Sequence, residues 1–123
     1  MPLPPVIVNA PPTTQYVFER SGGAIVHARL SIWSDPGLPT QRRAEVLFFE
    51  DSLDDIETFT RSLPKGTYAC VLLVFIREDL NGVYAYKHRV GDQLVAEDSG
   101  DVNVSAQPGE GRANRHEYGL VLA

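Results

Sequence analysis

The sequence is poor in cysteine, in basic residues and in long apolar runs, and each shortage excludes a class of protein. Its 123 residues include one cysteine, Cys70, so no disulfide can form within the chain. This excludes the small secreted proteins that depend on disulfides and agrees with a reducing compartment. Eleven Lys and Arg against sixteen Asp and Glu give a net charge of -5. We therefore expect no nucleic-acid partner, because such binders need a basic face.

Apolar stretches are short throughout the sequence. None approaches the ~20 residues that cross a bilayer, so we expect no membrane span. Residues Met1 to Pro12 lack the basic end and the continuous apolar segment of a secretion signal, which favours a cytoplasmic location. The length and a hydrophobic content of 43% fit one globular domain over residues 13–123, preceded by a Pro-rich arm over residues 1–12.

The arm holds five of the nine prolines, whose fixed φ and missing N–H donors favour an extended chain. Within it lies the short apolar piece Val6-Ile7-Val8. This piece pairs as an edge strand with its own sheet, adds to the sheet of a partner, or stays disordered. We expect pairing with its own sheet and a contribution to stability or association.

Alternating apolar and polar residues predict β-strands along most of the chain. In Ala24–Trp33 the apolar residues fall on one face and His27, Arg29, Ser31 and Trp33 on the other. Tyr68–Ile76 is nearly all apolar, as expected of a central strand covered on both faces. Further strands are expected at residues 14–20, 44–49, 83–90, 94–96, 102–105 and 116–122.

Two short turns predict β-hairpins. Ser21-Gly22-Gly23 separates the first two long strands. Asn81-Gly82 suits a type I′ turn, because both central positions of that turn need positive φ. That turn would pair Tyr68–Ile76 with Val83–Val90, with Leu80 opposite Val83.

The segment from residue 52 to 63 has two interpretations. Ser52 followed by Asp55 resembles a capping box, and apolar residues recur after it at helical spacing. The β-prone residues 58–60 and the Pro64-Lys65-Gly66 turn favour a strand and a corner instead. We expect the fold that follows from the strand interpretation: all-β, an antiparallel β-sandwich of about seven to nine strands, immunoglobulin-like or jelly-roll-like. The helix interpretation predicts an α+β domain.

The stretch Leu63-Pro64-Lys65-Gly66-Thr67-Tyr68-Ala69-Cys70 resembles the corner before the penultimate strand of immunoglobulin-like sandwiches. In those proteins a Tyr two residues before a Cys hydrogen-bonds back across the turn, and Tyr68 and Cys70 have this spacing. The resemblance implies such a bond from Tyr68 and supports a sandwich. It is confined to the corner, because this chain lacks the second Cys of an inter-sheet disulfide.

Recognisable catalytic motifs are missing from the sequence. His27, His88 and His116 have no partner at an informative spacing, and we interpret each as a surface residue. Cys70 lies in an apolar strand, where we expect it to be buried and unreactive. No GxSxG turn or phosphate-binding loop occurs. We therefore expect a protein that is not an enzyme and that needs no cofactor.

Acidic residues gather in two segments, at residues 50–57 and 97–103. In the second, Asp98, Asp101 and Asn103 supply oxygen atoms of the kind that calcium prefers. The spacing does not match the twelve-residue EF-hand loop. We interpret both segments as ordinary acidic loops, with calcium at Asp98, Asp101 and Asn103 as the alternative.

Aromatic residues that face outward are the main binding candidates. Trp33 with Arg29 on the same strand face, and Tyr84 with Tyr86 on the later hairpin, offer rings that stack on a partner protein or a sugar. The opposing interpretation places these rings under a second sheet. We expect a non-catalytic protein-interaction or assembly module, its partner another protein or a second copy in a homo-oligomer. The alternative is a lectin-like sandwich that binds carbohydrate with the help of calcium.

Overall fold

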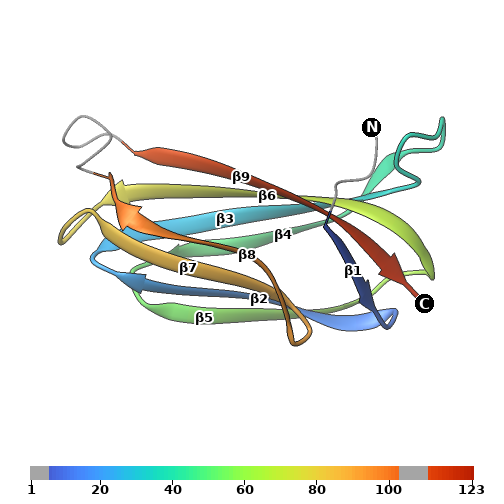
Figure 1. Ribbon diagram of the computed structural model, residues 1–123, viewed down its shortest axis with the longest axis horizontal. Helices are drawn as coiled ribbons and strands as arrows, with labels where there is room; N and C mark the ends of the chain where they lie inside the picture. Colours follow the sequence, from blue (N-terminus) through green and yellow to red (C-terminus); the bar gives the residue numbers. More distant parts are fainter. Residues whose placement is uncertain (1–5, 103–110) are drawn as a thin grey trace.

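The computed structural model is a sandwich of two β-sheets, and it describes residues 6–102 and 111–123 (Figure 1). All of its elements are strands: β1 Ile7–Ala10, β2 Thr13–Gly22, β3 Ala24–Ser34, β4 Arg42–Ser52, β5 Asp55–Ser62, β6 Gly66–Glu78, β7 Val83–Val90, β8 Gln93–Asp101 and β9 Arg112–Leu122. Among the described residues there is no helix with the length and apolarity of a membrane span.

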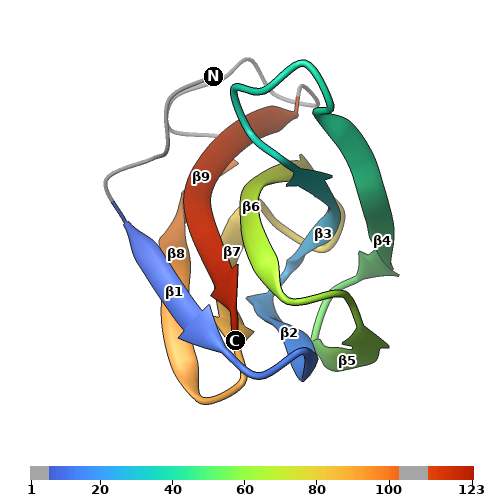
Figure 2. The ribbon, with the colours of Figure 1, turned by 90° about the vertical axis from the view of Figure 1, so that its right-hand side faces the viewer.

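The strands form two sheets. Sheet A has the order β1-β9-β6-β3-β4, and sheet B has the order β5-β2-β7-β8. Figure 2 shows the two layers from one end of the sandwich. Neighbouring strands are antiparallel except β1 and β9, which run parallel. The predicted antiparallel β-sandwich is confirmed. The helix alternative is wrong, because β5 pairs with β2 along its whole length.

Side chains that alternate along each strand fill the space between the sheets. The alternation predicted for Ala24–Trp33 is confirmed, since the apolar face of β3 is buried and the other face lies outside sheet A. The core combines apolar and aromatic residues from both layers, among them Tyr16, Phe18, Val26, Leu30, Ile32, Leu47, Phe49, Leu72, Val74, Ile76, Tyr118 and Leu120.

Strand β6 is central in sheet A, with β3 on one side and β9 on the other. Its first half is buried on both faces, as predicted, over Tyr68–Leu72. Toward the other end Leu73 is half-buried and Phe75 is 37% exposed. The prediction of full coverage is therefore wrong for this end, where the outer face of sheet A is open.

The N-terminal segment pairs with its own sheet, as predicted. Strand β1 lies along β9 from Ile7 opposite Gly119 to Ala10 opposite Leu122. The N–H of Gly119 donates to the carbonyl of Val6 at 2.7 Å. Val8 faces inward and is fully buried, so this strand contributes directly to the core.

Both predicted hairpins are wrong, because the chain changes sheet at each turn. β2 and β7 belong to sheet B, whereas β3 and β6 belong to sheet A. Neither Asn81 nor Gly82 has a positive φ, so no type I′ turn forms. The two crossings bind each other instead: the N–H of Gly23 donates to Val83 O, and the N–H of Leu80 donates to Gly23 O, both at 2.9 Å.

A tight hairpin does form at Gly91-Asp92, where β7 and β8 meet with Val90 opposite Gln93. Gly91 has a φ of 59°, as the first central position of a type II′ turn requires. Strands β8 and β9 are longer than predicted. Most of the strand expected at residues 102–105 lies outside the described residues.

The crossing between β2 and β3 leads to a prediction for Gly22. Its φ is 113°, and an added Cβ would lie 2.3 Å from the Val83 carbonyl oxygen. We expect Gly22→Ala to lower the free energy of unfolding by about 2 kcal/mol, because backbone on both crossings must move. Gly91→Ala is the control, since it also has positive φ but no atom closer than 3.7 Å. Urea unfolding should show a smaller loss for it, and equal losses would contradict the prediction.

The corner before β6 has the contact that the immunoglobulin-like resemblance implies. The hydroxyl of Tyr68 donates to the carbonyl of Pro64 at 2.6 Å. The bond closes the turn between β5 in sheet B and β6 in sheet A. Cys70 follows inside the core, and it is buried as predicted.

Candidate functional site

The outer faces of the two sheets differ in character. The outer face of sheet B carries charged side chains on its central strands, including Glu19, Lys87 and Arg89, and Arg89 pairs with Glu19 at 3.0 Å. The corresponding part of sheet A presents aromatic rings, of which Phe48 is 61% exposed. Contiguous apolar patches of this kind mark interaction sites more often than single exposed residues do.

A groove lies on this outer face across β3, β4 and β6. It has a volume of about 560 Å³ and is lined by His27, Ala28, Arg29, Phe48, Phe49, Glu50 and Phe75. The strand register assembles it, because Arg29 on β3 stands opposite Phe48 on β4 and opposite Leu73 on β6. We call it the sheet A groove.

Aromatic rings form the walls of the groove. Phe48 comes from β4, the edge strand, and Phe75 comes from β6. The ring of Phe75 stacks on His27, with 4.9 Å between centroids and 19° between planes. Because His27 and Phe75 are opposite each other in the β3–β6 pairing, this stack is fixed by the backbone register.

Arg29 supplies the groove with a positive charge, and the exposed Glu50 also lines it. The Nε of Arg29 is buried and has no hydrogen-bond partner among the described residues. Guanidinium groups bind carboxylates through two parallel hydrogen bonds, and a buried donor without an acceptor lowers stability. The residue as a whole is half-buried and lines the groove, so a ligand carboxylate there would form an ion pair with its guanidinium.

The other predicted residue of this face, Trp33, lies farther along β3. Its outward placement is confirmed, although the side chain is half-buried rather than fully exposed. The guanidinium of Arg43 lies over the indole, 6.0 Å from the ring centroid. Trp33 does not line the sheet A groove, so of the two outward-facing residues only Arg29 does.

The exposure expected of Tyr84 and Tyr86 is wrong, because these residues are 1% and 2% exposed. They alternate with outward residues on β7 and point toward sheet A. The hydroxyl of Tyr84 accepts a hydrogen bond from Arg112 at 2.6 Å. The hydroxyl of Tyr86 lies 2.6 Å from Nε2 of His116. Both rings are therefore part of the interior and offer no outer surface.

Of the three calcium candidates, only Asp98 and Asp101 lie within the described residues. The carboxylate of Asp98 accepts hydrogen bonds from the Tyr84 hydroxyl at 2.8 Å and from Asn114 Nδ2 at 2.9 Å. Asp101 ends β8, and Asn103 lies outside the described residues. Among residues 6–102 and 111–123, no group of three His, Cys, Asp or Glu is placed to hold a metal ion.

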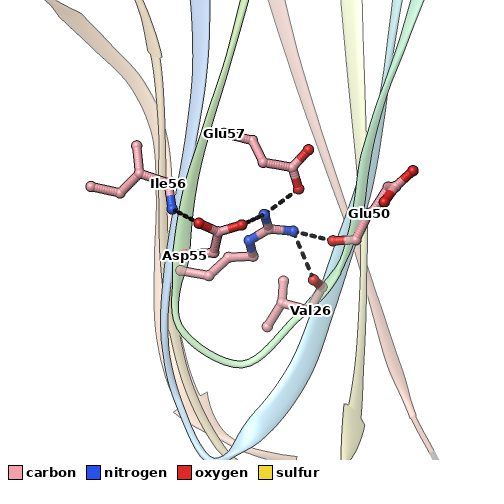
Figure 3. A network of polar contacts seen from close by, with 6 residues as sticks. Val26, Glu50, Asp55, Ile56 and Glu57 are labelled. Atoms are coloured by element: carbon pink, nitrogen blue, oxygen red, sulfur yellow. Dashed lines mark hydrogen bonds and ion pairs between the residues drawn. The ribbon is translucent and has the colours of Figure 1, made fainter.

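The other acidic segment surrounds a buried arginine of the protein itself. Arg20 is 1% exposed, and its Nη2 donates to Glu57 Oε1 at 2.5 Å and lies 3.6 Å from Asp55 Oδ2. Its Nη1 donates to the carbonyls of Val26, at 3.1 Å, and Glu50. Figure 3 shows these groups converging from β3, β4 and β5. Arg20 thus joins the two sheets at one end of the sandwich.

His88 and Cys70 are both buried in the core, and burial shifts the pKa of each. His88 was expected at the surface, but it is fully buried, and burial lowers its pKa to about 4. Its Nδ1 lies 2.8 Å from Val17 O and its Nε2 lies 2.9 Å from the Tyr118 hydroxyl. Burial raises the pKa of Cys70 to about 12, which keeps the thiol protonated at neutral pH.

The sequence reasoning missed Phe48 and Phe75, although a signal for each was present. Leu47, Phe48 and Phe49 are consecutive, and successive side chains of a strand face opposite sides. With Leu47 and Phe49 in the core, Phe48 must point outward. The same reasoning applies to Phe75 between Val74 and Ile76.

Comparisons with protein-family models, with curated proteins and with solved structures found no match for this chain.

Proposed function

We propose that the protein is a non-catalytic interaction module that binds another polypeptide through the sheet A groove. One observation carries the proposal: Arg29 lines a groove whose walls are the exposed rings of Phe48 and Phe75. Arginine and aromatic residues dominate the binding energy of protein interfaces when they cluster in this way.

The groove chemistry defines the class of ligand. A carboxylate would pair with the guanidinium of Arg29, and a large apolar side chain beside it would cover Phe48 or Phe75. An extended peptide with an acidic residue next to Leu, Ile or an aromatic residue has both groups. Burial of Tyr84 and Tyr86 removes two of the three rings on which the carbohydrate alternative depended. The guanidinium of Arg43 lies over the third, Trp33, so a polypeptide is the better supported ligand.

Selection from a random peptide library displayed on phage, with the full chain as bait, tests this function. We expect acidic and large apolar residues to be enriched in the selected peptides. Phe48→Ser should raise the Kd of a selected peptide by about tenfold or more, measured by fluorescence anisotropy. Ile56→Ser is the matched control, because Ile56 is also 61% exposed but faces outward from β5 in sheet B.

A second comparison isolates the contact with Arg29. Amidation of the acidic side chain of the peptide should weaken binding to the wild-type chain and should have little effect on the Arg29→Gln variant. The proposal is wrong if the library yields no binding peptide. It is also wrong if Phe48→Ser and Ile56→Ser change the affinity equally.

A further inference from the structure

We propose that the Glu78-Asp79-Leu80 segment of a second copy occupies the sheet A groove, so that two chains form a two-fold symmetric dimer. This inference rests on the proposed function, because it uses the same groove and names its occupant. The argument depends on three features of the segment: its exposed side chains, its fixed backbone and its distance from the groove.

Leu80 is the most exposed large hydrophobic residue of the described part of the chain, at 77%. It follows Glu78 and Asp79, whose side chains are also exposed. The segment therefore presents one apolar side chain next to two carboxylates. Those are the groups that Arg29 and the rings of Phe48 and Phe75 would bind.

The backbone of the segment is held in place although its side chains are exposed. The N–H groups of Leu80 and Asn81 both donate to the carbonyl of Gly23, at 2.9 and 3.2 Å. The N–H of Asp79 donates to Asn81 O at 3.2 Å. Because the crossing is already ordered, docking of Leu80 would require little further loss of backbone entropy.

The groove and the segment are close enough for mutual docking around one axis. Leu80 follows Phe75 by five residues, the last two of which lie beyond the end of β6, so the chain between them spans at most about 17 Å. A two-fold axis between them brings Leu80 of each copy to the groove of the other. Each copy then contributes the same patch, as an isologous interface requires.

Sedimentation equilibrium of the full chain, over loading concentrations from about 5 to 500 µM, tests the proposal. The contact surface is small, so we expect a weak monomer–dimer equilibrium with a Kd of about 10 to 100 µM. Leu80→Ser should raise this Kd by about tenfold or more. Ile56→Ser, which removes an exposed apolar side chain from sheet B, should leave it unchanged.

A mixing experiment identifies the interface by a gain of association, so that it does not depend only on variants that lose it. In the proposed dimer, Arg29 of each copy faces Asp79 of the other copy, which gives two equivalent contacts. Arg29→Glu makes both members of each contact negative and Asp79→Arg makes both positive, so each variant alone should be monomeric. In an equimolar mixture, one chain of each variant can pair. At one contact of that mixed dimer the two substituted positions face each other with opposite charges, and at the other contact the native Arg29 faces the native Asp79. The mixture should therefore associate close to the wild-type level, which a folding defect in either variant would not produce.

Several outcomes overturn the inference. The dimer is excluded if the wild-type chain stays monomeric at the highest concentration, or if mixing does not restore association. A mass that keeps rising with concentration indicates open head-to-tail growth and contradicts the two-fold arrangement. If a monomeric wild-type chain still binds selected peptides through Phe48, only the second copy as occupant is wrong and the proposed function stands.

Discussion

Replacement of Arg20 by alanine should lower the free energy of unfolding by about 3 kcal/mol, because it leaves buried groups without their partner. The guanidinium is fully buried and binds Glu57 and Asp55 together with two main-chain carbonyls. The Glu57 side chain is only 23% exposed, so water cannot fully replace the arginine as a partner of its carboxylate. Urea unfolding at neutral pH measures the effect.

Arg89→Ala is the matched control for this prediction. Arg89 also lies in sheet B and also pairs with a glutamate, Glu19, at 3.0 Å. Both of those side chains are more than a third exposed, at 34% and 40%, so the pair should contribute only about 0.5 kcal/mol or less. Similar losses for the two variants would mean that the buried position of Arg20 has no special role.

The strands themselves could be predicted from the sequence because alternation is a local property. Ala24–Trp33 shows which residues share a face, and β3 has that arrangement. The spacing of Tyr68 and Cys70 likewise predicted a bond from the Tyr68 hydroxyl across the corner. These features depend on residues within a few positions of one another.

The pairing of strands could not be predicted in the same way. Asn81-Gly82 favours a hairpin locally, but β6 forms two complete ladders in sheet A, with β3 and with β9. Many main-chain hydrogen bonds to distant strands outweigh the preference of one turn, so β7 joins sheet B. The residues of a single turn therefore do not reveal which distant strands pair with each other.

Alternation also does not say which face of a strand is the inner one. Arg29 and Trp33 face outward as predicted, whereas Tyr84 and Tyr86 face inward on β7. The tyrosine hydroxyls can be buried because Arg112, Asn114 and other polar groups of β9 meet them between the sheets. Arg112 and Asn114 belong to sheet A, so the alternation along β7 cannot reveal them.

Buried His88 predicts that the protein loses stability in acid. Its ring lies among Val17, Tyr118 and Phe49, and burial lowers its pKa to about 4. In the unfolded chain the ordinary pKa of 6.5 applies. Between these two values the unfolded state binds more protons than the folded state, so the free energy of unfolding falls as the pH falls.

The expected loss from this one residue is about 3 kcal/mol as the pH falls to 4, and little of it is expected above pH 6.5. Because acidic residues add their own pH dependence, the wild-type chain must be compared with His88→Gln, which cannot bind a proton there. The difference in unfolding free energy between the two proteins, measured by urea unfolding, should shrink as the pH falls through this window.

His116 is the control for this comparison. Burial lowers its pKa in the same direction, but the residue is only half-buried, so His116→Gln should change the pH dependence less. A proton NMR titration of the imidazole resonances assigns the effect directly. The prediction is contradicted if the His88 resonance titrates near its ordinary pKa while the chain is folded. Its ring would then take up a proton without opening the contacts to Val17 and Tyr118. Any loss of stability in acid would have to come from other groups.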